Sequence, residues 1–149
     1  MISVTPYKEM FSSRLHYDLP SVFSHLNVLD DGCAKKISSY LENGLVLFEF
    51  VSPVPSIIDK KTLVPYVLYS DGEYCWDGML LHLVKEYSVE LPKAFIDYIL
   101  GCEFLPNQSK VLNRDEICKE YMANKEKLRY LLVDGLQVSL SDLISTSKH

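Results

Sequence analysis

The sequence predicts an α+β domain that is predominantly helical and carries a small antiparallel sheet. Four segments have apolar residues spaced three and four positions apart, which is the period of a helix. Only two short runs are rich in β-branched and aromatic residues, and they lie close enough in the chain to pair as a hairpin. Helices are therefore expected to supply most of the regular structure.

Residues 1–149 are expected to form a single domain. Apolar residues make up 48% of the chain and charged residues 23%, which is typical of a folded globular protein and excludes a disordered one. The sequence has no internal repeat and no linker long enough to separate two domains. A chain of this length buries roughly two-thirds of the surface that its unfolded form exposes. One core is therefore expected.

The first long helix is expected over about residues 32–43. Asp30 can cap its start, and Asn43 followed by glycine predicts its end. A shorter helix is expected at about 21–29, directly after Pro20. The apolar face of the longer helix is formed by Ile37, Tyr40 and Leu41.

Two strands are expected next, at residues 45–51 and 66–70. The proline-rich connection between them is long, so the strands are expected to pair as a wide antiparallel hairpin. Side chains alternate between the two faces of a strand. This alternation predicts that Val46, Phe48 and Phe50 face the core.

The Asp71-Gly72 pair predicts a turn with a positive φ angle. Beyond the turn the apolar residues take on helical spacing, so a helix is expected over about 77–87 with Asp77 as its N-cap. Trp76 precedes this helix and continues its apolar stripe, so its ring is expected to lie in the core. The segment is predicted to join the sheet to the helix.

Two further helices are expected in the second half of the chain. One begins at Pro92 and stops at Gly101. The other begins at Asn113, which is followed three residues later by a glutamate in the form of a capping box, and it runs to Gly135 with a bend or break about half-way. Residues 135–144 fit a last strand or a short helix.

The net charge of −5 is concentrated in residues 66–103, where seven acidic residues accompany two lysines. A negative field repels the phosphates of nucleic acids and attracts basic proteins. Nucleic-acid binding is therefore not expected. The segment is expected to be either a contact surface for a basic partner or a solvated acidic surface.

Known catalytic and metal-binding motifs are absent from the sequence. The four cysteines are 42, 27 and 16 residues apart without a CxxC pair, and the histidines lack zinc-site spacing. There is no GxSxG elbow, no phosphate-binding loop and no dinucleotide-binding glycine pattern. We expect free thiols, no catalytic residue, no metal and no cofactor.

The sequence also predicts a cytoplasmic location. No stretch approaches the ~20 consecutive apolar residues that a membrane span needs. The first twenty residues lack the apolar run and the cleavage site of a signal peptide. No contact with a membrane is expected.

Residues 69–99, YSDGEYCWDGMLLHLVKEYSVELPKAFIDYI, combine an aromatic strand, Asp-Gly, a tryptophan, a helix ending in tyrosine, and Leu-Pro-x-x-Phe-x-x-x-Ile. This pattern resembles small bacterial immunity proteins of polymorphic and contact-dependent toxin systems. The upstream LENGLVLFEFVSPVPSIID is similar as well, so the resemblance covers about residues 36–99. The family commonly has threonine, tryptophan and proline where this chain has Ser70, Tyr74 and Asp77.

The resemblance implies a protein without catalysis that binds one cognate toxin, often a basic nuclease, and blocks it. It also implies that the shared motif is architectural, which gives structural roles to Gly72 and Trp76. Four carboxylates of the acidic segment are candidate contacts for the toxin: Asp71, Glu73, Asp77 and Glu86.

Two alternatives to the immunity function stay open. The first is an adaptor domain that binds a protein unrelated to toxins. The second is a small hydrolase that uses Cys75 or the carboxylates of Asp71, Glu73 and Asp77. The sequence does not define an oligomeric state.

Overall fold

A computed structural model of the chain describes residues 1–11, 19–103, 113–139 and 142. A six-stranded mixed sheet crosses the molecule in the order β2-β5-β6-β1-β7-β8. The strands are β1 (Ile2–Val4), β2 (Leu45–Glu49), β5 (Val67–Ser70), β6 (Tyr74–Asp77), β7 (Arg129–Leu131) and β8 (Gln137–Ser139).

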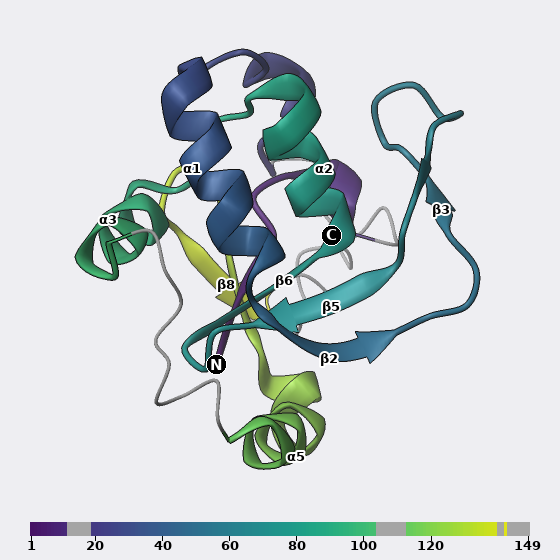
Figure 1. Cartoon of the computed structure of the whole chain (residues 1–149), viewed down its shortest axis with the longest axis vertical. Coiled ribbons are helices and arrows are strands. Elements are labelled where there is room, and N and C mark those ends of the chain that lie inside the picture. Colours follow the sequence, from purple (N-terminus) through teal and green to yellow (C-terminus); the bar gives the residue numbers. More distant parts are fainter. Residues whose placement is uncertain (12–18, 104–112, 140–141, 143–149) are drawn as a thin grey trace.

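Helices lie on both sides of this sheet (Figure 1). The long helices α1 and α2 lie side by side over one face, and α5 lies on the opposite side against β2. The connection between β2 and β5 carries a separate two-stranded antiparallel sheet of β3 (Val54–Pro55) and β4 (Leu63–Val64). The helices are α1 (Asp31–Glu42), α2 (Gly78–Tyr87), α3 (Lys93–Gly101) and α5 (Arg114–Asn124).

The expectation of a predominantly helical domain with a small antiparallel sheet is wrong. The main element is the mixed sheet, in which β1 lies between β6 and β7 and runs parallel to both. Strands of three or four residues are too short to show an apolar period, so β1, β7 and β8 leave no signal in the sequence. Strand β6 was not predicted because the position of Trp76 also fits the apolar spacing of α2, the helix that follows it.

Several elements with strong local signals are confirmed. Asp30 accepts a hydrogen bond from the backbone of Cys33 at 2.7 Å and caps α1. Asp77 caps α2 in the same way, with Leu80 as the donor at 3.0 Å. The hairpin of β2 and β5 is antiparallel, and α3 follows directly after Pro92.

The predicted core face of β2 is wrong. Leu47 is the buried residue of this strand, with 2% of its surface exposed, whereas Phe50 is 50% exposed. The pairing register with β5 shifts between Val46 and Phe48, which is a β-bulge. A bulge places one extra residue on one strand and reverses the faces beyond it. Simple alternation therefore fails here.

The ends of the chain also differ from the expectation. Only a 3₁₀ turn at Val22–Ser24 forms where a helix over 21–29 was predicted. The helix predicted from Asn113 ends at Asn124, where a bend or break was expected, but its expected continuation to Gly135 is wrong, because β7 and β8 follow instead. Residues 137–139 of the ambiguous last segment are thus a strand, and its residues 140–141 and 143–144 lie outside the described residues.

The core lies between α1, α2 and the sheet. Apolar side chains of both helices are buried there together with Val4 of β1, Trp76 of β6 and Leu131 of β7. Burial of this apolar surface supplies the main stabilising free energy. No helix within the described ranges is long and apolar enough to cross a membrane.

Candidate functional site

The Asp71-Gly72 turn faces the interior of the molecule. Tyr40 of α1 donates its hydroxyl to Asp71 Oδ2 at 2.5 Å. The other carboxylate oxygen, Oδ1, accepts the backbone N–H groups of Glu73 and Tyr74 at 2.9 and 2.8 Å. Gly72 has a φ of 98°, as predicted. Asp71 has no exposed surface, so it ties α1 to the β5–β6 hairpin and is inaccessible to a partner.

Trp76 is a second link between the sheet and α1. Its indole Nε1 donates to the backbone oxygen of Leu41 at 3.1 Å, and only 1% of its surface is exposed. The rings of Tyr40 and Phe95 each lie 5.9 Å from the Trp76 ring. A Cβ atom at Gly44 would lie 2.5 Å from Trp76 Cζ2, so Gly44 leaves room for the indole. The prediction of a core anchor is confirmed.

The four predicted contact residues do not form one site. Glu73 is exposed in the turn before β6, whereas Glu86 is exposed near the end of α2, which starts at the other end of β6. Asp77 lies between them in the chain and is partly exposed on the sheet face away from α1. Asp71 lies inside. The structure therefore separates these carboxylates instead of clustering them.

Two further acidic side chains of residues 66–103 lie next to a histidine or a lysine of the chain. Glu90 lies 3.5 Å from the ring of His25, and Asp97 forms an ion pair with Lys93 at 3.2 Å. Together with the interior position of Asp71, these contacts break up the expected surface. The segment does not present a single acidic face.

The side of the sheet opposite α1 and α2 carries a groove of about 550 Å³, which we call the aromatic groove. Strand side chains alternate between faces, so Trp76 points to the helices while its neighbour Asp77 points into this groove. Helix α5 and the turn after it close one side of the groove. Its aromatic lining consists of Phe11, Phe48, Phe50, Tyr66, Tyr121 and Tyr130.

The rings at the mouth of the groove are accessible. Phe50 and Tyr66 are 50% and 43% exposed, and their ring centres lie 4.4 Å apart. Deeper in the groove, Phe48 of β2 lies 5.9 Å from Tyr121 of α5. Accessible aromatic side chains are enriched at protein–protein interfaces. The aromatic groove is therefore the candidate binding site of the described residues.

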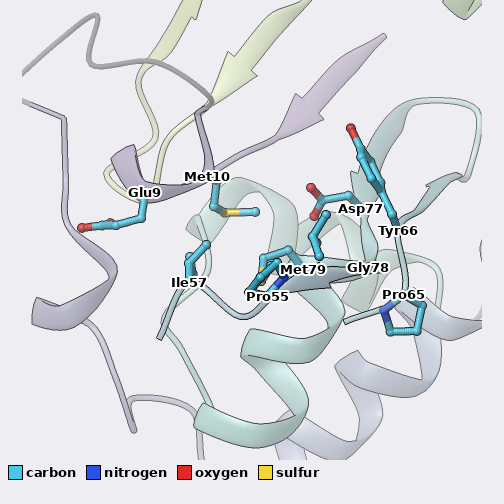
Figure 2. Close-up of a pocket in the computed structure, with 10 residues that line it drawn as sticks. Glu9, Met10, Pro55, Ile57, Pro65, Tyr66, Asp77, Gly78 and Met79 are labelled. Carbon is cyan, nitrogen blue, oxygen red and sulfur yellow. The ribbon is translucent and has the colours of Figure 1, made fainter. Parts of the chain in front are cut away.

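Asp77 is the acidic residue of the groove. It accepts the backbone N–H of Leu80, and its pKa is raised because the surrounding protein removes most of its water; the backbone hydrogen bonds only partly oppose this effect. Figure 2 shows its carboxylate beside Tyr66 and directed toward Met10. A second hollow of about 220 Å³, between η1 (Lys8–Met10) and the start of α2, shares these residues and adjoins the groove.

Cys75 lacks the environment of a nucleophile. It is 1% exposed, and burial raises the pKa of its thiol to about 12. The carboxylates of the hydrolase alternative do not converge either, because Asp71 and Asp77 lie at opposite ends of β6. All four cysteines are free, as predicted.

Ser56 and His82 form a hydrogen bond of 2.8 Å that resembles a catalytic pair. Ser56 has no exposed surface, and its hydroxyl also accepts the backbone N–H of Ile58 at 3.2 Å. Burial lowers the pKa of His82, and this effect is larger than the opposite one of the nearby charges of Glu86 and Asp59, which raise the pKa. A substrate cannot reach this hydroxyl, so the pair fastens the β3–β4 connection to α2.

Within the ranges that the structure describes, no three histidine, cysteine or acidic side chains are grouped so that they could hold a metal ion. The aromatic groove was not predicted because five strands, α5 and two 3₁₀ turns, η1 and η3 (Lys125–Lys127), contribute to it. Comparison of the chain with protein-family models, with curated proteins and with solved structures gives no significant match.

Proposed function

We propose that this chain is a bacterial immunity protein that neutralises one cognate toxin in the cytoplasm by forming a stoichiometric complex with it. The proposal starts from the resemblance of residues 36–99 to such proteins. It is supported by the positions of Asp71 and Trp76, which serve as internal joints between α1 and the sheet. An architectural motif of a binding protein is expected to have this role.

The surroundings of Cys75 favour binding over catalysis. A thiol with a pKa of about 12 is protonated at neutral pH, and the thiolate is the nucleophilic form. The accessible aromatic groove offers the type of side chain that contributes most binding energy at protein interfaces.

The toxin is expected to be basic, often a nuclease. The chain carries a net charge of −5, so it attracts a basic partner over distances greater than a contact. Such steering raises association rates by about 10- to 1,000-fold at low salt. Glu73 and Glu86 are the exposed members of the predicted contact set.

Co-expression tests the proposal directly. A toxin domain encoded immediately upstream of this chain should stop growth when expressed alone, and the chain should restore growth. The purified proteins should then form a one-to-one complex by size-exclusion chromatography with light scattering. Absence of rescue by a folded, expressed chain would contradict the proposal.

The adaptor alternative has a different outcome. It predicts a stable partner in a pull-down from cells, no neighbouring toxin gene and no growth phenotype. Glu73→Lys is a useful variant in both experiments because it changes the surface charge without touching the core.

A further inference from the structure

The aromatic groove joins two chemical features that recognise a cation. Its walls carry ring faces, and a cation within about 6 Å of such a face is attracted by the ring quadrupole. Asp77 also lines the groove, and its carboxylate lies beside Tyr66 (Figure 2). Phe50 and Tyr66, at the mouth, are both about half exposed, so a partner can contact their rings.

The carboxyl group of Asp77 lines the groove without a basic side chain as its partner among the described residues. Within the described residues it forms no ion pair, and its hydrogen bond comes from the backbone of Leu80. The start of α2 contributes partial positive charge, yet loss of water outweighs it as the main influence on this carboxyl. A guanidinium group in the groove would supply this carboxyl group with an opposite charge and with hydrogen-bond donors.

We propose that the aromatic groove receives an arginine side chain of a protein partner, with the guanidinium group against the Asp77 carboxylate and beside the rings of Tyr66 and Phe50. The inference rests on the proposed function only in taking the arginine to belong to the toxin. The site itself is a property of this chain.

Arginine fits the groove better than lysine or an apolar side chain. A planar guanidinium stacks on aromatic rings and donates several hydrogen bonds to a carboxylate, whereas an ammonium group is compact and strongly hydrated. An apolar side chain would cover the carboxyl group of Asp77 and offer it no hydrogen bond, which is costly. Lys125 also lines the groove, but it is not among the groups that act on the Asp77 carboxyl in the described part of the chain.

The groove can be tested without the toxin. N-acetyl-arginine methylamide is titrated into ¹⁵N-labelled protein, and its citrulline analogue, which has the same length but no charge, is the control ligand. Arginine should cause saturable shifts at Tyr66, Asp77 and Tyr121, and citrulline should bind at least about 10-fold more weakly. Equal responses to the two ligands, or no saturable shift at these residues, would overturn the inference.

Two matched variants assign the effect to Asp77. Asp77→Asn keeps an N-cap side chain on α2 but removes the charge, and Asp30→Asn makes the same change at the cap of α1. Asp77→Asn should abolish arginine binding, and Asp30→Asn should leave it unchanged. The amide spectra of both variants establish that they are folded. Unchanged binding to Asp77→Asn would overturn the inference.

The same variants separate this inference from the proposed function. In complex with the toxin, Asp77→Asn should weaken affinity by at least about 30-fold, the effect of leaving a buried charge unpaired, while Asp30→Asn should not. Equal toxin affinity of both variants would remove the groove inference and leave the immunity function intact. If the chain binds arginine but does not bind the toxin, the groove inference stands and the immunity function is contradicted.

Discussion

The two faces of the sheet differ in how their polar side chains are satisfied. On the face under α1 and α2, Trp76 and Asp71 are buried and bonded to partners from α1. On the opposite face, Asp77 and Tyr66 line an accessible groove. Trp76 and Asp77 are neighbours on one strand, so a single sequence motif supplies architecture on one face and a candidate contact on the other.

Replacement of Trp76 should have the largest effect on stability. Trp76→Ala removes a fully buried ring and should lower the free energy of unfolding by about 3–5 kcal/mol. Phe50→Ala on the opposite face is the control and should cost about 1 kcal/mol or less, since half of this side chain is already exposed. Urea denaturation measures both. An unchanged midpoint for Trp76→Ala would contradict its assignment to the core.

Loss of the Tyr40 hydroxyl should have the next largest effect. Tyr40→Phe removes the donor to Asp71 Oδ2 and leaves a buried carboxylate oxygen with one bond fewer, which should cost about 1–3 kcal/mol. Tyr66→Phe is the matched control because it removes a hydroxyl at the mouth of the groove. Thermal unfolding of the two variants compares the faces directly, and equal melting temperatures would contradict the proposed link.

Local signals account for the part of the fold that the sequence predicted. The caps Asp30 and Asp77 and the positive φ of Gly72 depend on a few adjacent residues, and all three are present in the structure. The internal position of Trp76 followed from the apolar stripe that continues into α2. These features could be predicted because each is determined within about one helical turn.

Long-range pairing explains the part that could not be predicted. Strand β1 exists because Ile2 aligns with Tyr74 on one side and with Arg129 on the other, more than seventy residues away. No pattern within residues 1–5 contains this information. The aromatic groove depends on the same pairing, and the outward position of Phe50 depends on the bulge in β2. Both were therefore missed.

The Ser56–His82 link should make stability depend on pH. Burial lowers the folded-state pKa of His82 below its unfolded value of about 6.5, so the unfolded chain takes up the proton first as the pH falls. Protonation therefore favours unfolding, and the stability lost should grow as the pH drops below about 6.5. Asp59 and Glu86, the acidic groups that act on His82, reduce this effect but do not reverse it.

Comparison of two proteins isolates this contribution. The melting temperature of the wild type should fall more between pH 7.5 and pH 5.5 than that of His82→Gln, because glutamine can keep a hydrogen bond to Ser56 without titrating. All other titrating groups are common to both proteins and cancel in the difference. Identical pH profiles would contradict a role for His82.

Glu73→Lys should have the smallest effect on stability and is the sharpest test of which face meets the toxin. Glu73 lies in the exposed turn before β6 and, with Glu120 of α5, lines a shallow hollow on the α5 side of the molecule. Glu86 lies near the end of α2 on the other side. Reversing either charge should change the unfolding free energy by no more than about 0.5 kcal/mol.

The association rates of these two variants should differ if the toxin covers the aromatic groove. Glu73→Lys places a positive charge beside α5, which also lines the groove, so it should slow association at low salt. This slowing should disappear at 1 M salt, where charges are screened beyond about 3 Å. Glu86→Lys makes the same charge change on α2, over the other face of the sheet, and should slow association less. A larger effect of Glu86→Lys would indicate that the toxin contacts α2, and it would contradict the assignment of the aromatic groove as the contact face.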